Sequence, residues 1–350
     1  MDEILRQPVA GPVAWSATDM ADPAIWTYAL SPPEIAELEA ALAHARQTGR
    51  SGYEIRREDF PLPNLADAMK AWIAEIEDGR GFLVVKGLPI FNHDEASIYD
   101  LYWGLGTHLG NGIIQNYEGR RINEVSSRGH SYDDVNIRAY ATSNELFFHN
   151  DPSDLAILMC VRQAKSGGLS HIASSSMIYN DILREHPEYL ETLFQGFHHD
   201  VRGEGPTGKF DEVTDVAIPV YSYFAGKLSC CLSPKACVTG REKMGGTLTN
   251  LEREIFAFIE SCSARPDRHL SFKIEPGDML MMNNYTVFHG RSGFEDWADP
   301  ERKRLLLRLW LNLHEGRPLA RRFTGRFNTG DRGGAVVQNH TDEIVAAAGR

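Results

Sequence analysis

The sequence contains no long hydrophobic run, although 42% of its 350 residues are apolar. A membrane-spanning helix needs about 20 consecutive apolar residues, so we expect no membrane partner. The first residues include acidic side chains and lack the apolar stretch of a secretory signal. These absences favour a cytoplasmic protein.

Cysteine is also scarce. The chain has five cysteines, an odd number that includes an adjacent pair: Cys160, Cys230, Cys231, Cys237 and Cys262. Their spacing matches neither a disulfide framework nor a Cys-x-x-Cys zinc knuckle. None lies in a nucleophile signature. We therefore expect reduced, mostly buried thiols without a catalytic role.

Positive charge is not concentrated in any part of the chain. The formal net charge is −12, and no tract combines clustered basic residues with aromatic ones. A phosphate backbone attracts such clusters, so nucleic acid is not an expected partner. The charged fraction of 24% is ordinary for globular proteins. We expect a small-molecule substrate as the partner, and the composition leaves a homo-oligomer open.

The N-terminal part of the chain is expected to be largely helical. Residues 1–30 are irregular, with several prolines and aromatics, and predict an arm across the surface. A helix should follow Ser31-Pro32-Pro33-Glu34, which combines an N-cap serine, an early proline and the glutamate of a capping box. Apolar spacing predicts further helices at about 65–76 and 94–105, with a short buried strand at 81–87 between them.

From residue 113 onward the pattern changes to short β-like runs separated by turn residues. These runs are expected at about 113–117, 122–125, 137–140, 155–161, 169–174, 218–224, 227–232, 270–274, 279–282 and 304–313. Helices at about 177–194 and 249–262 interrupt them. Short strands at this spacing favour a sandwich or barrel over a doubly wound parallel sheet.

The chain is long enough to bury a large core, and no repeat or low-complexity segment divides it. We expect a single domain over residues 31–317, preceded by the arm at 1–30. Residues 318–350, rich in arginine and glycine, predict a loosely ordered tail with a short helix at 341–348.

A metal-binding pattern occurs in Leu146-Phe147-Phe148-His149-Asn150-Asp151-Pro152. In an extended chain residues i and i+2 point to the same face, so His149 and Asp151 aim an imidazole and a carboxylate into one space. Two histidines and one carboxylate form the facial triad of non-haem Fe(II) oxygenases. A His-x-Asp pair is common by chance, so a metal site here requires a third ligand from elsewhere.

Two later segments supply suitable partners. His289 stands just after a predicted buried strand, where a third ligand would be placed. In the predicted strand at 304–313, Arg304 and Arg308 share a face with Trp310. Arginines that point into a barrel need anionic partners, and a guanidinium binds a carboxylate bidentately. Taken alone, this segment also fits a solvated polar face on an edge strand.

Together these residues resemble the taurine dioxygenase-like (TauD/TfdA) family of Fe(II)/2-oxoglutarate-dependent oxygenases. The motifs occur in the order seen in that family: His149-x-Asp151, Ala164-Lys165-Ser166-Gly167-Gly168-Leu169-Ser170, Pro276-Gly277-Asp278, Phe288-His289-Gly290-Arg291 and Arg304-x-x-x-Arg308. The match spans roughly residues 81–313. The resemblance implies a mainly β fold, a double-stranded β-helix (jelly-roll) core with α-helices packed outside and inserted between strands.

The resemblance also implies roles for individual residues. Fe(II) would be held by His149, Asp151 and His289 as the catalytic metal ligands. Arg304 would pair with the distal carboxylate of the cosubstrate 2-oxoglutarate. Ser170 stands where the family usually has a threonine that supports the same carboxylate, and serine keeps the hydroxyl.

Arg308 resembles a second arginine that approaches the cosubstrate or an acidic group of the substrate. The implied reaction consumes O2 and 2-oxoglutarate and releases succinate and CO2. A small polar metabolite would be oxidised, with hydroxylation as the expected outcome. Desaturation or ring formation starts from the same chemistry and stays open.

Residues near the metal motif are expected to bind the substrate. On a regular strand, Glu145 and Phe147 would lie on the His149 face, so Glu145 would meet a cation while Arg308 meets a carboxylate. This arrangement would suit an amino acid or a betaine-like acid, and a solvent-facing rim position for Glu145 is the alternative. Further candidates for the pocket wall are Asn116, Tyr140 and Trp310. For each of them plain packing is the alternative.

Two other functions stay open at this stage. One is a cupin-like metal enzyme that uses no 2-oxo acid, in which Arg304 and Ser170 would have no evident purpose. The other is a non-catalytic jelly-roll binding protein, against which the complete ligand set argues. The pair His198-His199, on an expected helix-to-strand connection, should lie outside the metal site.

Overall fold

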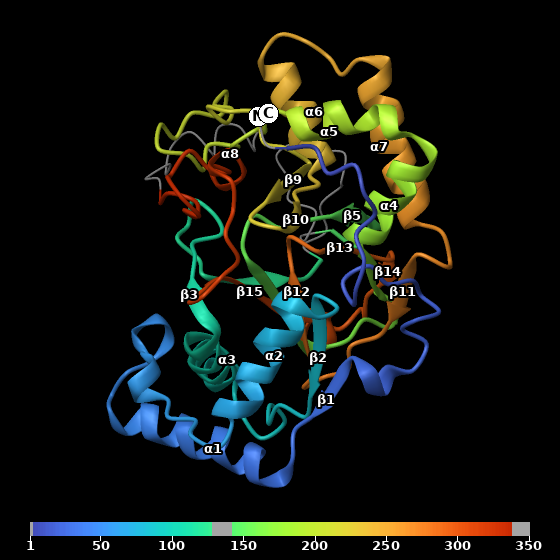
Figure 1. Cartoon of the computed structure of the whole chain (residues 1–350). Coiled ribbons are helices and arrows are strands. Elements are labelled where there is room, and N and C mark those ends of the chain that lie inside the picture. Colours follow the sequence, from blue (N-terminus) through green and yellow to red (C-terminus); the bar gives the residue numbers. More distant parts are fainter. Residues whose placement is uncertain (1–2, 128–141, 338–350) are drawn as a thin grey trace.

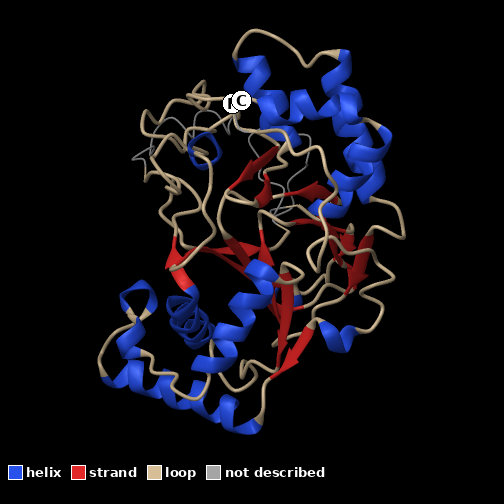
Figure 2. Ribbon diagram, in the orientation of Figure 1, coloured by secondary structure: helices blue, strands red, loops and turns tan. Residues whose placement is uncertain are grey.

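Two β-sheets face each other and enclose an apolar core (Figures 1 and 2). The computed structural model describes residues 3–127 and 142–337. Side chains of both sheets fill the space between them, among them Phe82, Ile172, Leu280 and Trp310. This two-sheet arrangement decides where the polar residues of the inner faces meet.

The larger sheet has seven strands in the order β1-β2-β12-β6-β15-β3, and β4 also pairs with β15. The strands are β1 (Thr27–Ala29), β2 (Phe82–Lys86), β3 (Gly110–Gly112), β4 (Ile122–Val125), β6 (Leu155–Arg162), β12 (Met279–Asn283) and β15 (Leu305–Leu313). The pairing of β1 with β2 is parallel, whereas β12 pairs antiparallel with β2 and β6, and β15 with β6, β3 and β4.

The smaller sheet has the order β11-β8-β13-β5 and is antiparallel. Its strands are β5 (Leu146–His149), β8 (Ser170–Ser174), β11 (His269–Phe272) and β13 (Val287–Arg291). From β11 to β13 and on to β15, the chain passes alternately to the smaller and the larger sheet. This alternation is that of a double-stranded β-helix, so the expected fold is confirmed.

The alternating side chains of β15 explain its central place. Leu305, Leu307 and Leu309 belong to the core under the helices, whereas Leu306 and Trp310 belong to the core between the sheets. Successive residues of a strand point to opposite faces. The predicted division of this strand into two faces is therefore confirmed, and both faces are buried.

Helices cover the outer faces of both sheets (Figure 1). Those packed in the core outside the larger sheet are α1 (Pro32–Gln47), α2 (Ala66–Asp78) and α3 (Glu95–Leu109). The core outside the smaller sheet contains residues of α4 (Ser175–Glu185), α5 (Leu190–Gln195), α6 (Pro234–Lys243), α7 (Asn250–Ser263) and the hairpin of β9 (Tyr221–Phe224) and β10 (Lys227–Cys230).

Several short elements complete the fold. They are α8 (Arg321–Thr324), the two-stranded antiparallel sheet of β7 (Ser166–Gly167) with β14 (Phe294–Glu295), and the 3-10 helices η1 (Pro23–Ile25), η2 (Gly52–Glu54), η3 (Arg57–Asp59), η5 (Pro187–Tyr189) and η6 (Pro300–Arg302). The start of α1 follows the expected capping pattern, because the carboxylate of Glu34 accepts the backbone N–H of Ser31 at 2.7 Å.

Two expected elements are wrong. The single helix expected at 177–194 is broken, because α4 ends at Glu185 and Pro187 opens a separate 3-10 helix. Proline lacks an N–H and disfavours helical geometry in the residue before it. The strand expected at 113–117 lies instead at Gly110–Gly112, directly after α3. The strand at 137–140 and the helix at 341–348 lie outside the described residues.

The N-terminal arm contributes to the interior. Trp15, Met20 and Trp26 are buried and belong to the core between the sheets. The indole N–H of Trp15 donates to the carbonyl oxygen of Arg80 at 2.9 Å. Besides crossing the surface, the arm thus closes one edge of the core.

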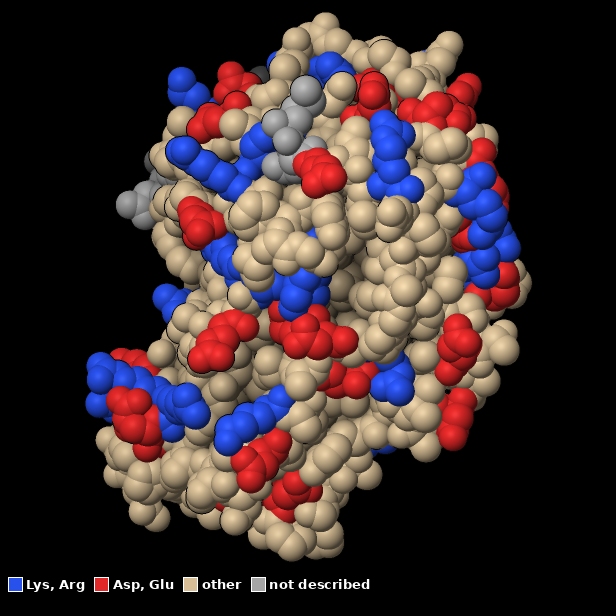
Figure 3. Space-filling model, in the orientation of Figure 1, with Lys and Arg blue, Asp and Glu red and all other residues tan. Residues whose placement is uncertain are grey.

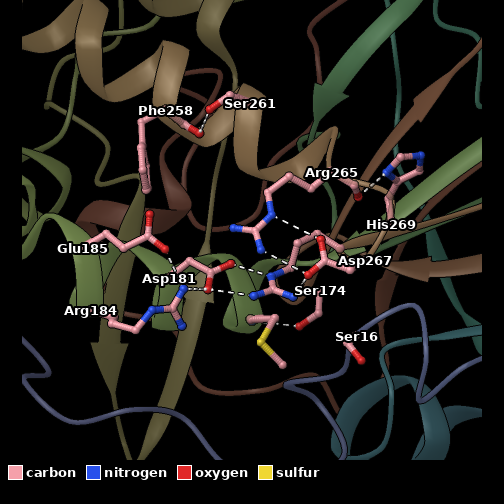
Figure 4. A network of polar contacts seen from close by, with 12 residues as sticks. Ser16, Ser174, Asp181, Arg184, Glu185, Phe258, Ser261, Arg265, Asp267 and His269 are labelled. Atoms are coloured by element: carbon pink, nitrogen blue, oxygen red, sulfur yellow. Dashed lines mark hydrogen bonds and ion pairs between the residues drawn. The ribbon is translucent and has the colours of Figure 1, made fainter.

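A polar network centred on the buried Asp181 joins α4 to the connection between α7 and β11 (Figure 4). The fully buried carboxylate of Asp181 pairs with Arg184 and with Arg268, each at 2.5 Å. Burial would raise the pKa of Asp181, but hydrogen bonds from Arg268 and Arg184 outweigh burial and lower it. Because the charge is fully paired, this network stabilises the helical layer without calling for a ligand.

Acidic and basic side chains are interspersed on the face drawn in Figure 3, where Lys and Arg form no broad continuous area. Over residues 3–127 and 142–337, no helix combines the length and apolarity needed to cross a membrane.

Candidate metal centre and cosubstrate site

The three predicted metal ligands converge on one point. The ligand atoms of His149, Asp151 and His289 all lie within 4.8 Å of one another. Nε2 of His289 lies 3.5 Å from Oδ2 of Asp151, and Nε2 of His149 lies 3.9 Å from Oδ1. The two histidines are direct cross-strand partners on β13 and β5. Two imidazoles and a carboxylate at this spacing fit Fe(II).

Hydrogen bonds orient the ligands. Nδ1 of His149 lies 2.8 Å from the carbonyl oxygen of Phe147 and donates to it, so Nε2 is left with the lone pair that binds a metal. The backbone N–H of Asp151 donates to Oδ1 of Asn284 at 3.1 Å, which fixes the chain just after β5.

Two side chains of β15 hold the carboxylate of Asp151. Nε1 of Trp310 donates to Oδ2 at 2.8 Å, and Nη1 of Arg308 lies 3.3 Å from Oδ1. Nε of Arg308 donates in turn to Gln115 Oε1 at 2.9 Å. The alternation of β15 thus supplies two donors that fix the orientation of the metal-binding carboxylate.

The protonation states also suit metal binding. Burial and then the neighbouring His289 lower the pKa of His149 to about 4, so the ring is neutral at pH 7. Burial would raise the pKa of Asp151, but the charge of Arg308 and the contact with His289 outweigh it and hold the pKa below its ordinary range. A neutral imidazole and an ionised carboxylate are the forms that coordinate Fe(II).

The sequence from residue 44 to residue 310 matches the model of the "Taurine catabolism dioxygenase TauD, TfdA family". The chain belongs to this family. It is therefore an Fe(II)/2-oxoglutarate-dependent dioxygenase. FR-33289 synthase of Streptomyces rubellomurinus is 32% identical over 323 residues, which cover 91% of this chain and 94% of that protein.

The chain is also similar to a second curated protein and to solved oxygenase structures. The "Taurine hydroxylase-like protein SAT17" of Stachybotrys chartarum is 26% identical over 309 residues, covering 85% of this chain and 78% of that one. A structure of asparagine oxygenase with Fe(II), (2S,3S)-3-hydroxyasparagine and succinate covers 82% of this chain and 93% of its own, with a TM-score of 0.64 at 15% identity. The oxygenase OrfP with Fe and α-ketoglutaric acid has a TM-score of 0.56 at 16% identity, covering 82% and 93%. Such structural likeness shows a shared fold.

The buried guanidinium of Arg304 carries donors that no described residue of this TauD/TfdA dioxygenase satisfies. The residue is 2% exposed, and its Nε and Nη1 have no hydrogen-bond partner in the described structure. Burial lowers its pKa to about 10. Gly168 lies at φ +69°, and a Cβ there would be 3.2 Å from Nε, so the glycine leaves the guanidinium room. A carboxylate such as that of 2-oxoglutarate would satisfy these donors.

Ser170 lies on β8 as the direct cross-strand partner of Arg291, and both are buried. Nη2 of Arg291 donates to the carbonyl oxygens of Thr142, at 2.9 Å, and Asn144, whereas its Nε and Nη1 lack partners in the described structure. Burial and then the charge of Arg304 lower the pKa of Arg291 to about 9. Arg291 therefore adds a second guanidinium near Arg304, a role that the His-Gly-Arg string signalled but that was not predicted.

A cavity of about 250 Å³ lies beside the metal ligands. His149, Asp151, Arg308 and Trp310 all form part of its wall. The wall also includes apolar side chains from β5 and α7: Leu146, Phe147, Phe148, Phe256 and Ile259. A small metabolite bound there would lie next to the metal position.

The residues before the metal motif lie differently from a regular strand. His149 pairs with His289, but Leu146 pairs with Arg291, so three steps on β5 match two on β13. Such a bulge shifts the faces of the residues before it. Phe147 is 50% exposed and lines the cavity, whereas Glu145 is exposed and is not part of the cavity wall.

The other predicted pocket residues are placed as follows. Trp310 reaches the cavity and contacts Asp151. Asn116 is buried away from the cavity wall, and its amide donates to Oδ1 of Asn123 at 3.3 Å. Tyr140 lies outside the described residues. The substrate-binding role predicted for Asn116 thus has no contact in the cavity to support it.

Several residues of the cavity wall were missed by the sequence reasoning, among them His199 and Arg326. His199 is not part of the metal group, as expected, but it lines the cavity wall. Arg326 lines it too, although it lies within the segment expected as a tail. Neither residue follows a strand or helix periodicity, so no local pattern pointed to them.

Proposed function

We propose that this dioxygenase hydroxylates a small polar acid of about amino-acid size, with the predicted triad and arginine in their family roles. The cavity beside His149 and Asp151 carries this proposal, because its volume of about 250 Å³ and its mixed apolar and charged wall suit such a molecule. The names of the similar proteins support it, since they include an asparagine oxygenase and a taurine hydroxylase-like protein.

Different residues of the chain would bind the metal and the cosubstrate. His149, Asp151 and His289 would occupy one face of the metal and leave positions for the cosubstrate and O2. Bound Fe(II) and 2-oxoglutarate supply the oxidising power that places one oxygen atom of O2 on the substrate and the other in succinate, with loss of CO2. Arg304 and Ser170 would fix the distal carboxylate of 2-oxoglutarate.

The walls of the cavity would position the substrate. Phe147 and the apolar residues of α7 can exclude water from the reacting carbon, which favours attack on the substrate over uncoupled turnover. Arg308 and Trp310 keep Asp151 in one orientation, so the substrate and the metal position keep a fixed relation.

Succinate formation tests the proposal. The purified protein with Fe(II), ascorbate, O2 and 2-oxoglutarate is screened against amino acids, betaines, sulfonates and aryloxy acids. We expect one class to raise succinate formation at least tenfold, with one hydroxylated product per succinate. Asp151→Ala serves as the inactive control. Should the anaerobic Fe(II)/2-oxoglutarate charge-transfer band form while no compound raises turnover, the substrate class is wrong and the metal site stands.

A further inference from the structure

We propose that His199 and Arg326 form an oxyanion-binding subsite in the wall of the substrate cavity. The inference rests on the proposed function and sharpens it: the substrate would carry an acidic group that these two side chains bind while the reacting carbon lies at the metal. The two residues come from the connection after α5 and from the segment after α8, and both line the same cavity as His149 and Asp151.

Arg326 is a buried cation whose hydrogen-bonding capacity is only partly used. It is 8% exposed, and its Nη1 donates to the backbone carbonyl oxygen of Asp151 at 2.9 Å. Its Nη2 is buried and has no partner in the described structure. The guanidinium lies 5.3 Å from the ring centre of Tyr285 and 5.4 Å from that of Phe323. The two rings thus help to hold the charge in place.

No carboxylate of residues 3–127 and 142–337 lies within 4 Å of the Arg326 guanidinium nitrogens. Burial would lower the pKa of Arg326, but the neighbouring Cys231, Tyr285 and Asp154 outweigh it and raise the pKa. The carboxylate of Asp154 itself pairs with Arg332 and accepts a hydrogen bond from Tyr285. A buried charge without a counter-ion costs stability. An anionic ligand that enters from the cavity would remove that cost.

His199 adds a second unsatisfied group. It is 5% exposed, and its Nε2 is buried without a partner in the part of the chain that the structure describes. The backbone N–H of His199 donates to Oγ1 of Thr214 at 3.0 Å, which fixes the segment. Burial and then the charge of Arg326 lower the pKa of His199 to about 3, so the ring is neutral at pH 7. A neutral imidazole keeps one N–H, so a bound oxyanion would accept a hydrogen bond from His199 as well as from Arg326.

Neither Asp200 nor a second, smaller cavity accounts for the unsatisfied donor of Arg326. Asp200, another residue of the cavity wall, pairs with Lys243 at 2.5 Å. Arg326 also borders a second cavity, but its volume of about 10 Å³ has room for no more than a water. The large cavity is therefore the space from which an acidic group can reach Arg326.

Anion binding can be measured without turnover. The protein is loaded with redox-inert Zn(II), saturated with 2-oxoglutarate to fill the Arg304 site, and titrated calorimetrically with acetate, sulfate or inorganic phosphate. We expect one saturable site, with the preferred anion showing whether the subsite suits a carboxylate or a tetrahedral oxyanion. Arg326→Met should weaken binding at least tenfold and His199→Asn several-fold.

Arg321→Met is the matched control, because Arg321 lies exposed in α8 and outside the cavity wall. The anaerobic Fe(II)/2-oxoglutarate band verifies that each variant keeps its metal centre. If Arg326→Met disturbs that centre through Asp151, His199→Asn decides, since it leaves the Arg326 contact in place. Unchanged anion affinity in His199→Asn, or in a band-positive Arg326→Met, overturns the inference.

The proposed function and the proposed subsite can be refuted independently of each other. Anion binding that depends on Arg326, together with an unproductive succinate screen, would support the subsite and contradict the proposed substrate class. A productive substrate without any acidic group, with an unchanged KM in His199→Asn, would leave the hydroxylase function intact and refute the subsite.

Discussion

Three buried arginines near the metal site, Arg291, Arg304 and Arg326, each have guanidinium nitrogens without hydrogen-bond partners in the described structure. Protein interiors rarely leave such donors unsatisfied, because desolvating a charge without a partner is costly. Burial lowers the pKa of Arg304 to about 10 and of Arg291 to about 9, which expresses the same cost. At the scale of single residues, therefore, these donors are free to bind anions, and their desolvation costs the empty protein stability.

Replacing Arg304 by leucine tests whether its unpaired buried charge favours ligand binding and lowers stability. Arg304→Leu should weaken 2-oxoglutarate binding on the order of 100-fold, because the buried carboxylate loses its charged partner. The free energy of unfolding of the cosubstrate-free variant should be equal to or above that of the wild type, since an unpaired buried charge is removed. Anaerobic titration of the charge-transfer band and urea unfolding measure the two effects. A large loss of stability with unchanged 2-oxoglutarate affinity would contradict the assignment.

His199 should make stability depend on pH. Its native pKa of about 3 lies below the usual value of about 6.5, so on acidification the unfolded chain binds this proton first and the native state loses stability. Over the roughly 1.5 units from pH 6.5 to pH 5 the loss is about 1.4 kcal/mol per unit, or about 2 kcal/mol in all.

Urea unfolding of metal-free wild type and His199→Asn at pH 7 and pH 5 checks this dependence. The wild type should lose about 2 kcal/mol more than the variant between the two values. Equal losses would mean that His199 is not buried in its neutral form.

At the scale of elements, the pairing of β13 organises the site. Its partners β5 and β8 bring His149 and Ser170 beside His289 and Arg291 respectively. Just beyond β13, β14 pairs with β7, and this strand pair places Gly168 against Arg304. The candidate metal ligands and Arg304 thus depend on neighbouring stretches of the smaller sheet and the strand pair beside it.

Gly167 is the most constrained position of that strand pair. It lies at φ +72°, and a Cβ there would be 2.3 Å from the carbonyl oxygen of Gly293. Gly167→Ala should lower the free energy of unfolding by about 3 kcal/mol or more, from backbone strain plus a clash with main chain. It should also weaken 2-oxoglutarate binding, because the strand pair next to Arg304 must shift.

Gly226→Ala separates the effect of backbone strain from the effect of the steric clash. Gly226 lies at φ +80° with nothing within 4 Å of the added Cβ, so only the strain of about 1–2 kcal/mol should appear. Urea unfolding and cosubstrate titration compare the variants. Equal effects on stability and an unchanged 2-oxoglutarate affinity would show that the β7–β14 contact does not position Arg304.

At the scale of the whole molecule, segments that precede and follow the jelly-roll strands in the sequence complete its interior. The N-terminal arm places Trp15, Met20 and Trp26 between the sheets, and the segment after α8 brings Arg326 and Phe327 to the cavity. Segments from both ends of the described chain therefore pack into the interior that holds the candidate metal ligands.

Removing one arm side chain should affect the whole fold. Trp15→Ala should lower the free energy of unfolding by about 3–5 kcal/mol, because a fully buried indole leaves a cavity and the carbonyl of Arg80 loses its donor. Ile25→Ala in the same arm, 38% exposed, should cost less than about 1 kcal/mol. Urea unfolding of the metal-free variants measures both, and equal losses would show that the arm packs only on the surface.

The sequence by itself determined the features that follow from local spacing. The alternation of β15 placed Arg308 and Trp310 on the inner face, and the His149-x-Asp151 motif with His289 predicted the metal group. Such predictions succeed because side-chain direction in a strand depends only on the backbone of that strand. The family motifs then connected the separate segments before their distances were known.

Only the tertiary structure decided what surrounds the metal. A bulge in β5 places Glu145 outside the cavity wall, and long-range packing brings His199 and Arg326 into it. Register shifts and loop paths depend on contacts with other segments, so no periodicity along the chain encodes them. For that physical reason the metal ligands could be predicted from sequence, whereas the residues that we propose to bind the substrate could not.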